Sequence, residues 1–285
     1  MRTFSLYKIS SEKEPGFDPG AYSRFKFGEG NEGEVFGLAL AKAFIAAHKN
    51  DLLGEREIVL LPSPYDSIPT ASFTLAQILK REINRFLQKN GKKSLLESKI
   101  HRYKTYSVDY GNLDFEQRLS LISGDTYHLD KNFLQGRLVL LVDDIRITGS
   151  HELMIANLLL DQKVEGDFIF MYLAELVNKD IAPNYENYLN YYAVKDMRDL
   201  LKLVLADSFI FNTRVIKYVL KSEEAQLDAF IASAPESKLI TLCDLAIGNN
   251  YHLMPEYRDN LQRIQQHLHY GYQSSKRTTG EPERS

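Results

Sequence analysis

Three short apolar runs, at 57–61, 137–142 and 167–174, are separated by longer stretches in which apolar residues recur at helical spacing. Each run is almost entirely apolar, as expected for a strand buried on both faces of a sheet. The helical stretches lie at 32–48, 73–90 and 152–160. Alternating strands and helices are typical of βαβ units, so we predict an α/β domain with a parallel sheet between about 30 and 175.

The remainder of the chain has a different pattern. Residues 1–27 are rich in turn-forming residues and contain no predicted element. Beyond residue 180, apolar residues at helical spacing predict a series of helices, at 200–205, 209–220, 227–231, 239–247 and 257–268. At 285 residues the chain has room for about two domains. We therefore expect an α/β domain at 1–180, an all-helical C-terminal region at 181–272 and a polar, disordered tail at 273–285.

Composition excludes several classes of protein. Lysine and arginine number 35 against 38 aspartates and glutamates, a net charge of −3, which argues against nucleic acid or an anionic membrane as a partner. The single cysteine, Cys243, excludes an intramolecular disulfide, and we expect it to be buried among apolar neighbours. Residues 1–8 lack the apolar core of a signal peptide, and no apolar run approaches the roughly 20 residues of a membrane span. We expect a cytoplasmic protein, with assembly into a homo-oligomer left open.

The strongest candidate for chemistry follows the second predicted strand. There Asp143 and Asp144 precede a small polar turn, Thr148-Gly149-Ser150, which opens the next helix. Ligands of open α/β sheets bind beyond the carboxyl ends of the strands. The N–H groups, hydroxyls and helix N-terminus of the turn form a cradle for phosphate, while the carboxylates suit a sugar diol or a metal ion held through water. The alternative is a strand followed by an Asp-rich turn and an ordinary helix cap.

This pattern, strand-Asp-Asp-x-x-x-Thr-Gly-Ser, resembles the phosphoribosyl-diphosphate (PRPP) motif of type I phosphoribosyltransferases. The resemblance implies that Asp143 and Asp144 bind the ribose 2′- and 3′-hydroxyls and hold Mg²⁺ through water. It assigns the 5′-phosphate to Arg146, Thr148, Gly149 and Ser150. Members that act on 6-oxopurines often carry an aspartate where this chain has Ile147, which argues against hypoxanthine or guanine as the acceptor.

A second loop, at 62–69, resembles the family's pyrophosphate loop in position. The resemblance implies that it holds the diphosphate and Mg²⁺ through Ser63, Tyr65, Asp66 and Ser67. The alternative is a turn stiffened by proline that caps the next helix. Because the loop lacks the basic residue that many members carry there, positive charge must come from elsewhere in the chain.

Three basic residues are the leading candidates for that charge, ahead of Arg24 and Arg118. Arg102 and Lys104 lie two apart in an extended segment, where the family has a mobile basic loop, and so face the same side. A solvated edge strand is the alternative for this segment. Lys26 adjoins the glycine-rich entry to the first predicted helix and is the third candidate.

Polar and aromatic clusters in the C-terminal half receive structural interpretations. We interpret the tyrosines between 185 and 192 as packing between the two regions, because packing is a commoner use of such a run than stacking on a base. The runs Asn212-Thr213-Arg214 and Asn249-Asn250-Tyr251-His252 are typical of loops and helix caps.

The leading interpretation is an enzyme similar to type I phosphoribosyltransferases, which binds PRPP with Mg²⁺ and transfers its phosphoribosyl group to a nitrogen acceptor. The resemblance covers roughly 25–175, and the whole chain resembles an outlying bacterial branch found in stress- or tellurite-resistance-type operons. The alternative is a non-catalytic regulator that binds PRPP or a nucleotide on the same fold. The position of the helical region relative to 143–150 decides whether it helps to build the acceptor pocket or mediates assembly.

Overall fold

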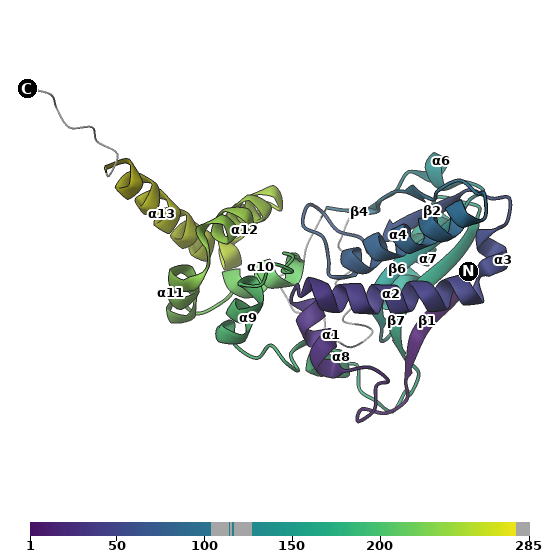
Figure 1. The fold of residues 1–285 in the computed structure, drawn as a ribbon, viewed down its shortest axis with the longest axis horizontal. Helices are drawn as coiled ribbons and strands as arrows, with labels where there is room; N and C mark the ends of the chain where they lie inside the picture. Colours follow the sequence, from purple (N-terminus) through teal and green to yellow (C-terminus); the bar gives the residue numbers. More distant parts are fainter. Residues whose placement is uncertain (104–113, 115, 117–126, 278–285) are drawn as a thin grey trace, which may run out of the picture.

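The computed structural model describes residues 1–103, 114, 116 and 127–277, and contains a five-stranded parallel sheet (Figure 1). Its strands, in spatial order, are β1 (Arg2–Ile9), β7 (Asp167–Leu176), β6 (Leu138–Arg146), β2 (Ile58–Pro62) and β3 (Leu96–Glu97). Each neighbouring pair is parallel. This arrangement confirms the predicted α/β fold, and it brings the carboxyl ends of β2 and β6 to the same edge.

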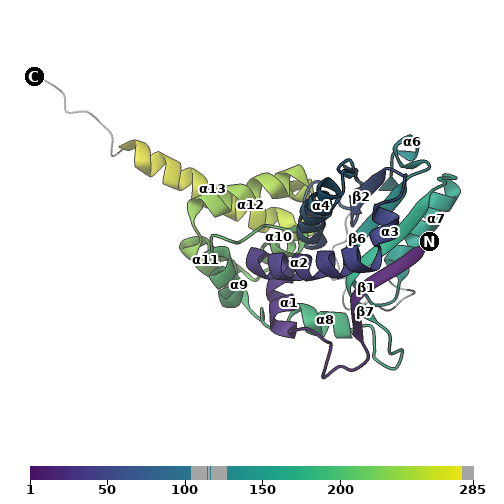
Figure 2. The same cartoon turned by 45° about the vertical axis from the view of Figure 1, so that its right-hand side comes forward.

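Helices cover both faces of the sheet because the central strands are apolar on both sides. Leu140 and Val142 of β6 pack with α2 (Gly30–Ala47) and α4 (Ser72–Lys89), which lie together across one face (Figure 2). Leu141 packs on the other face against α7 (Ser150–Asp161). The three predicted strands and the helices between them are therefore confirmed, with β6 extending through both aspartates to Arg146.

The N-terminal segment is more ordered than the sequence analysis expected. β1 forms the edge of the sheet, and α1 (Pro19–Lys26) follows it. Asp18 caps α1 by accepting the Gly20 and Ala21 N–H groups at 2.8 and 3.2 Å, and a proline occupies the first helical position. Short elements complete the α/β part: α3 (Lys49–Leu52), α6 (Lys131–Leu134) and α8 (Tyr185–Asn190), and an antiparallel pair, β4 (His101–Arg102) and β5 (Tyr127–His128).

The C-terminal region is helical, as predicted (Figure 2). Its helices pack around a second apolar core. Its elements are α9 (Met197–Val204), α10 (Thr213–Leu220), α11 (Glu224–Ser233), α12 (Glu236–Gly248), a 3₁₀ turn (Tyr251–Leu253) and α13 (Pro255–Arg277). The α/β core continues to Leu189, and the second core takes Phe27 and Ile68 from the α/β part together with residues from Val194 onward. Since α13 runs to Arg277, it overlaps the tail expected at 273–285, and residues beyond 277 lie outside the described part.

Hydrogen bonds join the helical region to the α/β part beside α1. The Gly30 N–H donates to the Ser208 carbonyl at 3.1 Å, and the Ile210 N–H donates to the Gly28 carbonyl at 2.8 Å. Gly28 has a φ of +90°, and a side chain there would meet the Ile210 carbonyl at 2.3 Å, so this junction requires glycine. Among the described helices, none combines the length and apolar character needed to cross a bilayer.

Candidate functional site

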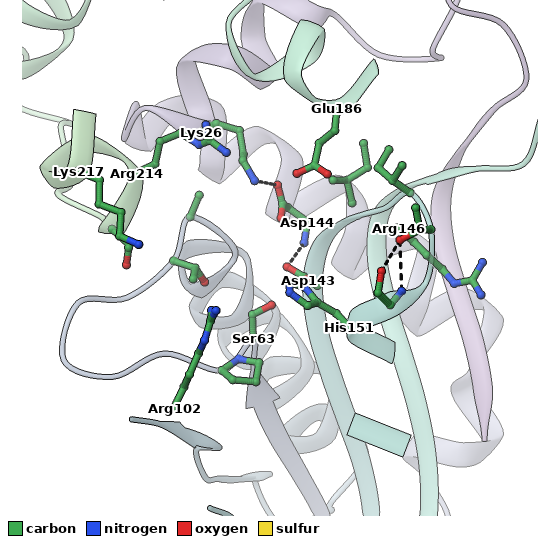
Figure 3. Close-up of a pocket in the computed structure, with 18 of the residues that line it drawn as sticks. Lys26, Ser63, Arg102, Asp143, Asp144, Arg146, His151, Glu186, Arg214 and Lys217 are labelled. Atoms are coloured by element: carbon green, nitrogen blue, oxygen red, sulfur yellow. Dashed lines mark hydrogen bonds and ion pairs between the residues drawn. The ribbon is translucent and has the colours of Figure 1, made fainter. Parts of the chain in front are cut away.

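A cavity of about 460 Å³ opens at the carboxyl ends of β2 and β6, the size of a typical small-molecule site (Figure 3). Asp143 and Asp144 form part of its wall, and the turn at 146–150 forms one side. The opposite side comes from α10, which belongs to the helical region. The cavity is therefore built from both parts of the chain.

Asp144 is the more deeply buried of the two carboxylates. Its Oδ2 accepts a hydrogen bond from the Tyr22 hydroxyl at 2.6 Å and forms an ion pair with the Lys26 ammonium group. Burial acts to raise the pKa of Asp144, but the charge and hydrogen bond of Lys26 outweigh burial, so the pKa lies below its usual value. Burial next to this carboxylate also raises the pKa of Tyr22. Asp144 is thus an anion held in place by α1.

Asp143 is the more accessible carboxylate, with its side chain 19% exposed against 8% for Asp144. Its Oδ1 accepts the Asp144 N–H at 2.9 Å, which fixes the carboxylate at the cavity wall. Its Oδ2 lies 3.4 Å from Nδ1 of His151, in the first turn of α7. The sequence analysis did not single out His151 as a site residue, although it directly follows the phosphate-type turn.

The turn after β6 has the geometry of an anion cradle. Gly149 has a φ of +77° and directly precedes α7, whose N-terminus faces the cavity. Thr148 and Ser150 share a hydrogen bond between their hydroxyls, and both line the cavity. The structure therefore brings Thr148, Gly149 and Ser150 together beside Asp143, as the sequence pattern predicts.

The Arg146 side chain lies against this turn and is held there by two glutamates. Its Nε donates to Glu152 at 2.7 Å and its Nη1 donates to Glu175 at 3.0 Å. A β carbon on Gly149 would lie 3.0 Å from the Arg146 Nη2 atom, so the backbone of the turn rests directly on the guanidinium group. Arg146 lines the cavity, but the carboxylates of Glu152 and Glu175 hold its side chain in a fixed position.

The loop after β2 contributes less to the cavity than the sequence analysis expected. Ser63 lines it and donates its hydroxyl to the Val142 carbonyl at 3.3 Å. Of the described residues that line the cavity, none is Tyr65, Asp66 or Ser67. Lys99 lies over the Tyr65 ring, 4.0 Å from its centroid, and donates to the Asp66 carbonyl.

The donors of Ser67 are directed toward the helical region. Its N–H and that of Ile68 donate to the Asn249 side-chain oxygen at 3.0 and 3.2 Å, and its hydroxyl donates to the Gly248 carbonyl at 2.7 Å. Asn249 therefore does more than cap a helix, because it also fixes the loop between β2 and α4. The cap interpretation of this run did not include that contact.

Two of the three predicted basic residues lie in the described part of the chain. Lys26 lines the cavity and pairs with Asp144, while Arg102 lines it from β4 below Ser63 (Figure 3). Lys104 lies outside the described residues. The arrangement of Arg102 and Lys104 on one side of a strand stays a prediction.

Several cavity residues were missed because they come from the helical region. Arg214, Lys217 and Lys221 recur at intervals of three and four along and just beyond α10, so they share one face, and all three line the cavity. The Arg214 guanidinium lies 5.9 and 5.6 Å from the centroids of the Phe27 and Tyr191 rings. The spacing of the basic residues along α10 was visible in the sequence. The sequence did not show that this face of the helix borders the cavity.

The donors at this site are compatible with a magnesium ion that the protein holds only in part. In the described part of the chain, no group of three His, Cys, Asp or Glu side chains is arranged to hold a metal ion. Mg²⁺ commonly takes one or two carboxylates and completes its octahedron with substrate phosphates and water. Asp143 at the cavity wall offers such a carboxylate, so the donor set fits an ion that enters together with a phosphorylated substrate.

The chain matches a known protein family over most of its length. A family model described as "PRTase ComF-like" matches residues 1–264. Among solved structures, the chain is similar to a hypoxanthine phosphoribosyltransferase from Staphylococcus aureus in orthorhombic crystals, at 15% identity and a TM-score of 0.34, over 51% of this chain and 76% of that one. The tetragonal form gives 15% and 0.34, over 50% and 74%. No curated protein matches the sequence.

Proposed function

The chain belongs to the PRTase ComF-like family, and we propose that it is a phosphoribosyltransferase that binds PRPP together with Mg²⁺. The reaction is attack by a nitrogen acceptor on C1 of the ribose. The new C1–N bond forms as the C1–O bond breaks, the electron pair leaves with diphosphate, and the acceptor nitrogen loses its proton to solvent.

One observation carries the proposal: the two aspartates and the phosphate-type turn line a single cavity next to each other. A 5-phosphoribosyl group needs an anion cradle and acceptors for a diol at adjacent positions, and this site provides both. The 5′-phosphate would accept hydrogen bonds from the N–H groups of Gly149 and Ser150, and the ribose hydroxyls would donate hydrogen bonds to Asp143. PRPP bound in this orientation would direct its diphosphate group away from the turn, toward α10 and Ser63.

The side chains mainly position reactants and stabilise charge, because the sugar approaches an oxocarbenium ion as diphosphate departs. Asp143 lines the cavity and would place negative charge beside the ribose ring, where that cation develops. The Lys26 ammonium group and the Tyr22 hydroxyl hold Asp144 as an anion. Bound Mg²⁺ would supply neutralisation of the leaving diphosphate, with Asp143 holding the ion directly or through water.

A non-catalytic sensor of PRPP or a nucleotide is the second candidate. It is favoured by the loop after β2, where the N–H groups of Ser67 and Ile68 already donate to Asn249. A loop fixed in this way suits binding without turnover, since fewer of its donors are directed at a leaving group. Both candidates predict the same PRPP site and differ in the release of diphosphate.

The test is titration calorimetry with PRPP in the presence of Mg²⁺, followed by an assay for diphosphate release over a panel of bases and amines. We expect PRPP to bind, and Asp143→Asn to weaken binding at least tenfold. The matched control is Asp161→Asn, at the far end of α7. No binding by the wild-type protein, or equal binding by Asp143→Asn, would overturn the proposal, while binding without release across the panel favours the sensor.

A further inference from the structure

The loop after β2 offers a diphosphate few donors. Residues 62–70 include no lysine or arginine. Two of the loop's N–H groups donate to Asn249, and the Ser67 hydroxyl donates to Gly248. Ser63, Pro64, Thr70 and Ala71 are the parts of this segment that line the cavity. A substrate with a highly charged leaving group therefore needs positive charge from another element.

The N-terminus of α10 is bonded to this same loop. The Thr213 N–H donates to the Pro69 carbonyl at 2.9 Å, and its hydroxyl donates to the Ile68 carbonyl at 2.8 Å. The Asn212 side chain caps α10 by accepting the Val215 N–H and donates to the Lys26 carbonyl at 3.1 Å. These contacts fix both the position and the rotation of α10 relative to the loop.

With its rotation fixed, α10 directs a basic face into the cavity. Lys217 follows Thr213 by about one helical turn and Lys221 follows by about two, so they lie along the face that Arg214 begins. Figure 3 shows Arg214 and Lys217 on the side of the cavity opposite the turn that carries Arg146. In the orientation of PRPP proposed above, this side of the cavity would face the C1 substituent.

We propose that Lys217 and Lys221 of the helical region bind the diphosphate of PRPP, in place of the basic residue that the loop after β2 lacks. The inference rests on the proposed function and extends it. It makes the helical region part of the active site, since this region both ties the loop through Asn249 and supplies the positive charge. As the C1–O bond breaks, these ammonium groups stabilise the charge that accumulates on the departing diphosphate.

The experiment compares two ligands that differ in the diphosphate group. Titration calorimetry of the full chain with Mg²⁺ measures the dissociation constants of PRPP and of ribose 5-phosphate. The variant is Lys217→Gln/Lys221→Gln. The matched control is Lys202→Gln on α9, whose side chain is 75% exposed and pairs with Asp199 outside the cavity.

We expect the double variant to weaken PRPP binding at least tenfold and to change ribose 5-phosphate binding less than twofold. The salt dependence of PRPP binding should also fall, because fewer ion pairs form. Lys217→Arg/Lys221→Arg should restore PRPP affinity to within threefold, which separates loss of charge from loss of structure.

Three results would overturn the inference. PRPP affinity of the glutamine variant within twofold of wild type would show that these lysines do not bind diphosphate. Equal weakening of both ligands, or no recovery in the arginine variant, would show a structural effect. These results leave the proposed function standing, whereas a wild-type protein that binds neither ligand removes the proposed function and the inference together.

Discussion

The ion pair between Lys26 and Asp144 allows a quantitative prediction about stability. Its side chains are only 10% and 8% exposed, so removing one partner leaves a charge inside the protein. In Lys26→Met, the Asp144 carboxylate keeps its hydrogen bond from the Tyr22 hydroxyl at 2.6 Å but loses the positive charge beside it. Breaking a buried pair in this way typically costs about 3–5 kcal/mol, and we expect the free energy of unfolding at pH 7 to fall by that amount.

The double variant tests the cause of this loss. Lys26→Met/Asp144→Asn removes both charges, and an asparagine still accepts a hydrogen bond from Tyr22. Replacing both members of a buried pair often costs little, so the double variant should recover at least half of the loss. Urea denaturation followed by circular dichroism measures each free energy, with unchanged denaturant slopes as the control for a common unfolded state.

The pH dependence gives a second test of the same pair. In the wild type the pKa of Asp144 lies below its usual value, so its contribution is present above about pH 4 and is lost as the pH falls through the lowered pKa. In Lys26→Met, burial without Lys26 raises that pKa, so the carboxyl takes up a proton and the variant is relatively more stable in acid. The difference between the two proteins should therefore shrink from pH 7 to pH 5. A loss under about 1 kcal/mol at pH 7, or additive losses in the double variant, would refute the reasoning.

Three further predictions follow from other contacts. Gly149→Ala should lower the free energy of unfolding by about 1–2 kcal/mol in urea denaturation and weaken ribose 5-phosphate binding, because φ is +77° there and alanine disfavours that conformation. Unchanged values would contradict the left-handed backbone at this position. Asn249→Ala should speed hydrogen exchange at the Ser67 and Ile68 amides, measured by mass spectrometry, and equal exchange would show that Asn249 does not fix the loop. Burial raises the pKa of Cys243 to about 11, so a thiol reagent at pH 8 should label only the unfolded protein, and rapid labelling of the native protein would contradict this. The free energy of unfolding should decline as the pH rises from 9 toward 11, because the thiol ionises first in the unfolded protein.

Much of the α/β part was predictable because its signals are local. Strands buried on both faces appear as apolar runs, and α2, α4 and α7 repeat apolar residues at helical spacing. The β1 strand escaped detection because an edge strand mixes exposed and half-buried positions, as its side chains do from Arg2 to Lys8. The α1 helix is only eight residues long, although Asp18 followed by proline was a usable signal for its start.

The candidate site was predictable only where one segment carries it. The stretch from Asp143 to Ser150 holds both carboxylates and the turn, so their place together at the end of a strand could be predicted from the sequence. The opposite wall depends on contacts between distant residues, such as Thr213 with Pro69, which no local pattern encodes. For the same reason the donors of Ser67 were assigned to a ligand, whereas the structure pairs its N–H with the Asn249 side chain and its hydroxyl with the Gly248 carbonyl.

The central claim is that one cavity, formed by both parts of the chain, binds PRPP. Hydrogen–deuterium exchange with mass spectrometry tests it directly, comparing the protein with Mg²⁺ alone and with Mg²⁺ and saturating PRPP. We predict slower exchange in two peptides at once, one spanning 146–153 and one spanning α10. Unchanged exchange at 146–153 would contradict the phosphoribosyl site, and protection there without protection of α10 would contradict the composite cavity.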